Sequence, residues 1–338
     1  MRRLLILLVL LLLSSTILMG QIDYTDFKDS YNEFSDKIAT ALPYLSTIGL
    51  NWSDAHLKEF PHFGIGITVG AVFLPTEAFG DVFDTFGVSI PGNFDIGQLG
   101  IPLPAYVVDA RLGGFKDFFD LGFKVGFIWD QAGKALSGMT GFDFDYLLMG
   151  GDIRFIVLKD EEKKPGISIG LGYNYMRGGV SKSNALGSSQ TIQFPAAMGL
   201  SDITVDSPDV SFFWECRVID LKAQLSKKIK FFTPYIGFGG SYGVASAGGG
   251  LTSNVRYGGS NITQADIDAI KAAFESAGMS VPDVSAEGIT LKADASGWSF
   301  RTFGGFSINI FYFIIDATAM WNFTSRSLGA DLNLRFQF

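Results

Sequence analysis

Apolar and polar residues alternate along most of this chain with a period of two. The last ten residues, GADLNLRFQF, place every second side chain on an apolar face, and the side chains between them are polar or glycine. Successive side chains of an extended strand point to opposite faces, so this pattern predicts a β-strand with one apolar and one polar side.

The same alternation recurs in about ten segments between residue 62 and the last residue. Each has roughly 9 to 14 residues, long enough for a tilted strand to cross a hydrocarbon layer. The segments are HFGIGITVGAVF, AYVVDARLGG, FDLGFKVGFIW, LMGGDIRFIV, ISIGLGYNY, SFFWECRVIDLKAQL, TPYIGFGGSYGV, WSFRTFGGFSINI, FIIDATAMWNF and GADLNLRFQF.

One segment changes phase. In SFFWECRVIDLKAQL the apolar positions are even up to Cys216 and odd from Ile219 onward. A single extra residue in one strand produces such a shift, so the pattern predicts a β-bulge near Val218. With the even positions outward before this bulge, Cys216 is expected to face lipid beside Trp214, as an inert buried thiol.

The connections between these segments alternate in length. Short polar links near residues 116, 159 and 226 alternate with long ones at about 75–103, 130–143, 179–208 and 247–294. Short turns on one side and long loops on the other are typical of a bacterial outer-membrane barrel. We therefore expect an all-β fold, a transmembrane antiparallel up-and-down β-barrel of about ten strands, within a range of roughly 8 to 14. A secreted β-sandwich also has alternating strands, but its outer face would here be charged and rich in glycine.

The amino-terminal region divides into two parts. Residues 1–20 carry two arginines followed by an apolar run and small residues, which predicts a secretory signal peptide, with a retained membrane anchor as the alternative. We expect residues 21–61 to form an amino-terminal helical plug segment and residues 62–338 to form the barrel. Apolar residues at helical spacing predict an amphipathic helix that ends before Pro43; they are Phe27, Tyr31, Phe34, Ile38 and Leu42.

Charged residues on the polar strand faces form a set of seven acids and seven bases that we expect to face the lumen. They are Asp109, Arg111, Asp120, Lys124, Asp152, Arg154, Glu215, Arg217, Asp220, Lys222, Arg301, Asp316, Asp331 and Arg335. Charges in a narrow lumen must be paired to survive desolvation, so one interpretation is a salt-bridged polar plug. The other is a narrow water-filled pore with both signs on its walls.

Composition and motifs argue against enzymatic or nucleic-acid chemistry. The net charge is −8, which disfavours a nucleic-acid partner. The two histidines, His56 and His62, lie at or before the first strand, at the end opposite the long loops, so we expect no hydrolase at the rim and no enzyme. No metal-ligand cluster or cofactor motif is visible in the sequence, and we expect neither a metal nor a cofactor.

The long connections contain two notable stretches. The first is unusually apolar, and Phe83, Phe86 and Phe94 are candidates for a lid or for contacts with a hydrophobic ligand. The last contains NITQADIDAIKAAFESAG, which predicts a short helix capped by Asn261 or Thr263 and ended by Gly278.

Two resemblances follow from these residues. The terminal strand, with Leu334, Phe336 and Phe338 on one face, is similar to the assembly signal of outer-membrane β-barrel proteins, which implies a contact with the outer-membrane assembly machinery. Residues 62–338 resemble uncharacterised barrel proteins of diderm bacteria that begin with HFGIGITVGAVF-like and LPAYVVDARLG-like strands. This resemblance implies a location in the lipid bilayer of the outer membrane and no particular activity.

The sequence favours a passive channel or transporter for small or hydrophobic solutes, with the amino-terminal helix as a periplasmic plug. The alternative is a closed-lumen structural or adhesive barrel whose extracellular loops bind a partner.

Overall fold

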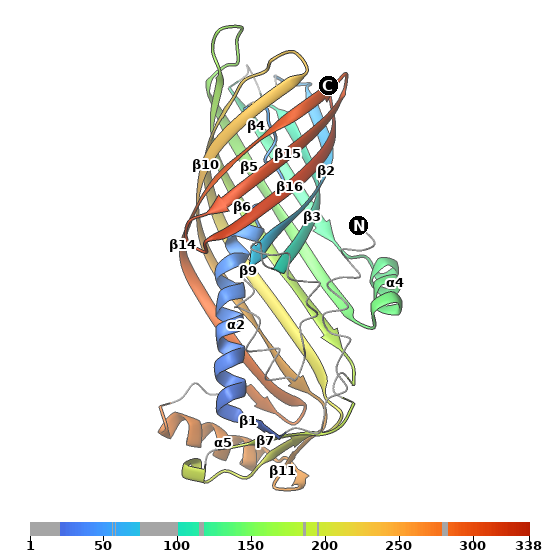
Figure 1. Cartoon of the computed structure of the whole chain (residues 1–338), viewed down its shortest axis with the longest axis vertical. Coiled ribbons are helices and arrows are strands. Elements are labelled where there is room, and N and C mark those ends of the chain that lie inside the picture. Colours follow the sequence, from blue (N-terminus) through green and yellow to red (C-terminus); the bar gives the residue numbers. More distant parts are fainter. Residues whose placement is uncertain are drawn as a thin grey trace.

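The computed structural model describes residues 21–55, 57, 59–74, 101–114, 118–184, 187–194, 196–278 and 283–338. Within these ranges, ten antiparallel strands close into a barrel (Figure 1), which confirms the expected fold. They are β2 (Phe63–Leu74), β3 (Ile101–Gly113), β4 (Phe119–Phe127), β5 (Asp143–Leu158), β6 (Gly166–Lys182), β9 (Asp209–Ser226), β10 (Phe232–Thr252), β14 (Gly288–Ile310), β15 (Phe313–Asn322) and β16 (Ser327–Gln337). The barrel closes because β16 pairs with β2 and β10 pairs with β14.

The two faces of the barrel wall have the opposite polarity to a soluble protein. The outward side chains of β2 and β16 are apolar and exposed, such as Ile67 (56%), Leu332 (62%) and Leu334 (55%). The inward side chains of the same strands include the buried Asp331 and Arg335. A continuous exposed apolar surface around a polar interior is the property of a transmembrane β-barrel. None of the helices in the described ranges is long and apolar enough to cross a membrane.

The two ends of the barrel differ. The short-turn end, where β3 joins β4, β5 joins β6, β9 joins β10 and β14 joins β15, also carries Phe338. At the opposite, long-loop end, β5, β6, β9, β10 and β14 continue well past the other strands (Figure 1). These five strands have 16 to 23 residues, and the other five have 9 to 13. Their extensions carry exposed charged side chains on the outer face, including Asp145 and Arg177, so this part of the wall lies outside the apolar belt.

A small cap lies at the long-loop end. Its sheet has the order β1 (Gln21–Asp23), β7 (Gln190–Gln193), β8 (Ile203–Val205), β11 (Val255–Tyr257) and β12 (Ser260–Asn261). Helix α5 (Gln264–Ser276) begins at Thr263, whose side chain and Asp266 form a capping box, so one of the two predicted caps is confirmed. The helix contributes Ile267, Ile270 and Phe274 to a second apolar core, which also includes residues of the cap strands, Leu251 of β10 and Ile289 of β14.

Three smaller elements complete the long-loop end. They are helix α4 (Asp130–Thr140), the 3-10 helix η4 (Ala196–Met198) and strand β13 (Asp283–Ser285).

In the cap, the Ser189 hydroxyl donates to Asp206 over 2.9 Å, which holds the pKa of that carboxyl below its ordinary value.

The predicted bulge near Val218 is wrong. Strand β9 pairs with β6 and with β10 without a register shift at that position. What changes there is the polarity of the two environments, because the outward residues become charged and the inward residues become apolar. The outer face becomes charged because it leaves the apolar belt, and the inner face becomes apolar because a helix packs against it inside the barrel.

Candidate functional site

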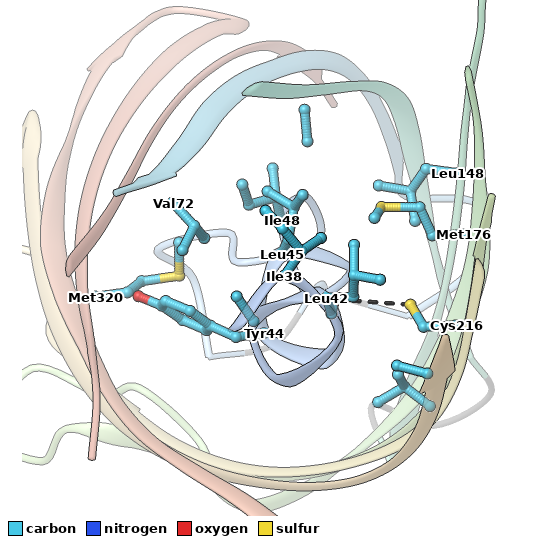
Figure 2. Packing of buried hydrophobic residues seen from close by; sticks show 14 of the residues in the cluster. Ile38, Leu42, Tyr44, Leu45, Ile48, Val72, Leu148, Met176, Cys216 and Met320 are labelled. Atoms are coloured by element: carbon cyan, nitrogen blue, oxygen red, sulfur yellow. Dashed lines mark hydrogen bonds between the residues drawn. The ribbon is translucent and has the colours of Figure 1, made fainter. Parts of the chain in front are cut away.

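Helix α2 (Tyr24–Leu45) enters the barrel from the cap, and its carboxy-terminal part lies in the long-loop half of the lumen (Figures 1 and 2). It continues through Pro43 to Leu45, so the expected end before Pro43 is wrong by one turn. Ile38, Leu42 and Leu45 are buried at 4% exposure or less and belong to one apolar cluster with residues of the wall. Figure 2 shows the wall residues around the helix; they include Val72, Leu148, Met176, Cys216 and Met320.

Cys216 is inside the barrel, and the expectation that it faces lipid is wrong. Its thiol donates to the carbonyl oxygen of Leu42 over 3.6 Å and contacts the hydroxyl of Ser46. The inward position follows from the unbroken register of β9, which places Cys216 and Val218 on the same face as Asp220. At the level of α2 this inner face is apolar because it packs against the helix.

The lumen segment, defined here as residues 46–57, fills the short-turn half of the barrel; His56 lies outside the described residues. It begins where α2 ends, and its first residues, Ser46 to Ile48, donate to the last four carbonyl oxygens of the helix. Lys124 binds the chain just after the helix: its Nζ donates to the carbonyl oxygens of Ser46 and Ile48, each over 2.7 Å. A cation at this position is also favoured by the helix dipole.

The barrel wall hydrogen-bonds mainly to the backbone of the lumen segment. Lys222 donates to the Leu50 carbonyl over 3.0 Å, and Gln224 donates to the Trp52 and Ser53 carbonyls over 2.8 and 2.9 Å. In the other direction, the amides of residues in the segment donate to the wall, Leu50 to Asp109 (3.1 Å), Ala55 to Ser226 (2.9 Å) and Leu57 to Asp120 (2.9 Å). Many backbone groups of the segment therefore have partners in the wall in place of secondary structure.

Charged side chains connect this wall into ion-paired groups. Asp120 binds Arg154 over 2.8 Å and also pairs with Arg111, which reaches Asp152 over 2.8 Å. Asp152 also binds Lys222 over 2.7 Å.

Elsewhere in the lumen, Asp220 binds Arg301 over 2.7 Å. Arg335 pairs with Asp316 and also with Asp54 of the lumen segment, over 3.0 Å. Asp331 accepts from Thr318 over 2.6 Å and from Asn51 over 3.4 Å.

The structure places twelve of the fourteen predicted lumen charges on the inner face. The other two, Glu215 and Arg217, were assigned to the wrong side of the wall. Their side chains are 42% and 66% exposed, and they pair with each other over 2.9 Å on the outer surface. The reason is the inversion on β9, because they lie beyond the apolar belt, where the outer face meets water.

Trp52 is the largest buried side chain of the lumen segment. The guanidinium of Arg335 lies 4.6 Å from its ring centroid and that of Arg111 lies 5.8 Å away, so the ring makes cation–π contacts with two bases. The ring also requires a glycine in the wall, because a Cβ at Gly64 would lie 2.7 Å from it. Sequence reasoning missed Trp52; the inward glycines of the first strand were the available signal for a crowded interior.

A hollow of about 570 Å³ opens at the short-turn end of the barrel. Its lining includes Asp54, Leu57, His62, Lys227 and Tyr312. His62 is held by its own turn, where its Nδ1 lies 2.8 Å from the Glu59 carbonyl oxygen. Among the described residues no group of three or more histidine, cysteine, aspartate or glutamate side chains could hold a metal ion.

The remaining predicted residues lie at the two ends. The candidate lid residues Phe83, Phe86 and Phe94 lie outside the described residues. Leu334, Phe336 and Phe338 are exposed on the outer surface near the short turns. The rings of Phe338 and Phe63 pack edge to face with centroids 4.1 Å apart, next to the junction of the first and last strands.

Comparison with known proteins finds similar solved structures only. No protein-family model matches the chain, and no curated protein sequence is detectably similar to it. Outer membrane protease OmpT from Escherichia coli is 8% identical with a TM-score of 0.37, over 82% of this chain and 97% of that one.

Two further barrels have similar scores. A Pseudomonas aeruginosa FadL homologue is 12% identical with a TM-score of 0.34, over 77% of this chain and 60% of that one. The transport unit of the autotransporter AIDA-I from Escherichia coli is 11% identical with a TM-score of 0.33, over 91% of this chain and 100% of that one. Scores this low support no statement about activity or substrate.

Proposed function

We propose that this protein is a closed-lumen β-barrel of the outer membrane of a diderm bacterium whose long-loop end binds a partner outside the cell. The observation that carries the proposal is the set of hydrogen bonds between the wall and the backbone of the lumen segment. Residues 41–50 are all buried, and charged wall residues bind the backbone groups that follow α2.

The proposed orientation places the short turns in the periplasm. Outer-membrane barrels have short periplasmic turns and longer extracellular loops. Here the connections at the Phe338 end are short, and the folded cap with α5 lies at the other end. The cap has its own apolar core, which gives the external surface a fixed shape for binding a partner.

The strength of the contacts favours a lumen that stays closed. Hydrogen bonds to charged groups contribute about 1.5 to 3 kcal/mol each. Two lysines and three aspartates of the wall bind the backbone of residues 46–57. Arg111 and Arg154 add bonds to the Leu50 and Asp54 carbonyls over 3.3 and 2.6 Å. An open passage through the lumen would require all of these bonds to break together. The passive channel, which was the first expectation from the sequence, stays a prediction.

Single-channel recording in a planar bilayer tests the proposal. We expect the purified protein to be silent at moderate voltage. Steady openings would contradict a closed lumen and support the solute channel.

A single substitution identifies the source of any openings. Ser46→Cys places a second thiol beside native Cys216, which the Ser46 side chain contacts. Oxidation would then tie the lumen segment to β9. If the protein conducts and oxidised Ser46→Cys does not, with recovery after reduction, then the lumen segment is a gate and the protein is a channel. Ser46→Ala under the same oxidant is the matched control.

We also propose that the protein is not an enzyme and that its terminal strand contacts the assembly machinery. In the described part of the chain, the one histidine is His62, which lies at the short-turn end, away from the external surface. The exposed row of Leu334, Phe336 and Phe338 supports the assembly contact, and Phe338→Ala should lower the yield of folded protein in the outer membrane without changing its synthesis.

A further inference from the structure

Helix α2 and the lumen segment run through the barrel in one direction, and their contacts with strand β9 show which direction this is. The contacts pair Leu42 with Cys216, Leu50 with Lys222, Trp52 with Gln224 and Ala55 with Ser226. Residue numbers rise together on both sides, so the segment approaches the short turn after Ser226 as it proceeds. Its amino-terminal side must therefore point to the long-loop end.

The other end of this segment is fixed in the cap. Strand β1, residues Gln21–Asp23, pairs in parallel with β7 and forms one edge of the cap sheet. Figure 1 shows β1 and the start of α2 beside β7 at the long-loop end, and the helix rising from there into the barrel.

We infer that the barrel displays its amino-terminal segment, from Gln21 onward, at the cell exterior, with residues 38–57 crossing the membrane inside the lumen as an additional span. This inference rests on the orientation given under Proposed function. It adds a further activity, because any polypeptide placed ahead of Gln21 would emerge outside the cell. It also replaces the periplasmic plug expected from the sequence.

The length of the internal span fits a membrane. The wall from Val218 to Ser226, within the apolar belt, covers eight residue steps, about 26 Å along a strand at about 3.3 Å per residue. A strand tilt of about 40° reduces this to about 20 Å along the barrel axis, most of the height of about 25 Å of the apolar band of such barrels.

The side chains of α2 become less exposed toward its carboxy-terminal end, which agrees with a helix that enters the barrel from the long-loop end. Glu33 and Asp36 are exposed, and Glu33 pairs with Lys37 over 2.8 Å in a surface salt bridge. From Ala41 to Leu50 every residue is buried. The exposed part of α2 thus lies outside the barrel at the long-loop end, where water can reach it.

Cysteine labelling on intact cells tests the inference, in a Cys216→Ala background. Glu33→Cys reports on α2, and Ser35→Cys, fully buried on the same turn, is its matched control. Glu275→Cys on α5 reports on the cap, and Glu162→Cys reports on the short turn between β5 and β6. A membrane-impermeant maleimide should label Glu33→Cys and Glu275→Cys on intact cells, and Glu162→Cys only after the outer membrane is permeabilised. Ser35→Cys should stay at least ten-fold less labelled than Glu33→Cys.

Two other results overturn the inference and can be told apart. If Glu275→Cys is labelled on intact cells and Glu33→Cys is not, the display of the amino-terminal end is refuted while the proposed orientation stands. If Glu275→Cys is protected and Glu162→Cys is labelled, the orientation itself is wrong and both proposals fall. Asp36→Cys repeats the α2 measurement should Glu33→Cys fold poorly, with folding checked by the heat-dependent shift of the barrel on gels.

Discussion

The two halves of the lumen are filled by the same continuous segment, yet the wall contacts it in different ways. In the long-loop half, apolar wall residues such as Met176 and Val218 pack against side chains of α2. In the short-turn half, charged residues such as Lys124 and Asp120 bind the backbone of the lumen segment. A helix satisfies its own backbone and presents side chains, whereas an extended segment presents amides and carbonyls. The chemistry of the wall follows from that difference.

The largest effect should come from the charged half. Asp120→Ala leaves Arg111 and Arg154 buried without this carboxylate, and breaking a buried pair in this way costs about 3 to 5 kcal/mol. We expect that loss in the free energy of unfolding, measured by urea titration in detergent micelles. Glu215→Ala, which removes an exposed pair on the outer surface, is the control and should cost about 1 kcal/mol or less. Equal losses would show that burial of the lumen charges has been overestimated.

The apolar half should respond to volume. Leu42 is 1% exposed in the cluster that joins α2 to the wall, so Leu42→Ala should lower the free energy of unfolding by about 3 kcal/mol. Leu42→Met keeps the volume and should cost less than about 1.5 kcal/mol. The same urea titration measures both. If the two variants were equally destabilised, the contact of α2 with the wall would not depend on packing.

A smaller effect should come from the closeness of the wall to α2. A Cβ at Gly243 would lie 2.7 Å from Cγ of Pro43, so Gly243→Ala should cost about 1 to 3 kcal/mol through overpacking. Gly138 in α4 has open space around its missing Cβ, and Gly138→Ala should be neutral or stabilise by up to about 1 kcal/mol. Thermal unfolding of the two variants side by side distinguishes a filled lumen from a loose one, since a loose lumen would tolerate both.

The smallest effect should be confined to the cap. Thr263→Ala removes the side chain that caps α5, which typically costs about 1 kcal/mol of helix stability. Hydrogen exchange should become faster for the amides of α5 and stay unchanged where β9 and β10 line the lumen, because the cap core takes Leu251 from the far end of β10 but shares no residue with the lumen cluster. Faster exchange in the barrel strands would mean that the cap and the lumen unfold as one unit.

Much of the barrel could be predicted from sequence because a period of two survives in any strand with two different environments. The lumen charges from Asp109 to Arg154 were assigned to the correct face, since their strands keep one phase within the membrane. Glu215 and Arg217 were misassigned because alternation reports a difference between two faces and not which face is inside. Beyond the belt both environments reverse, and the pattern inverts on an unbroken strand.

The contents of the lumen could not be derived in the same way. The amphipathic pattern of α2 indicates that one side needs an apolar surface, but a barrel offers such a surface both outside, to lipid, and inside. Residues 46–57 carry no periodic signal, because their contacts use the backbone. Only the balance of inward charges and the inward glycines, such as Gly64, pointed to a filled interior.

The junction between the first and last strands has a consequence for the order of assembly. Phe63 and Phe338 exchange two backbone hydrogen bonds of 3.0 Å there, so the cylinder cannot be completed until Phe338 has been made. Residues 46–57 are synthesised long before that moment and precede Phe63 by only five residues. Until then, water must bind their amides and carbonyls. They become enclosed only when the two ends of the sheet meet around them.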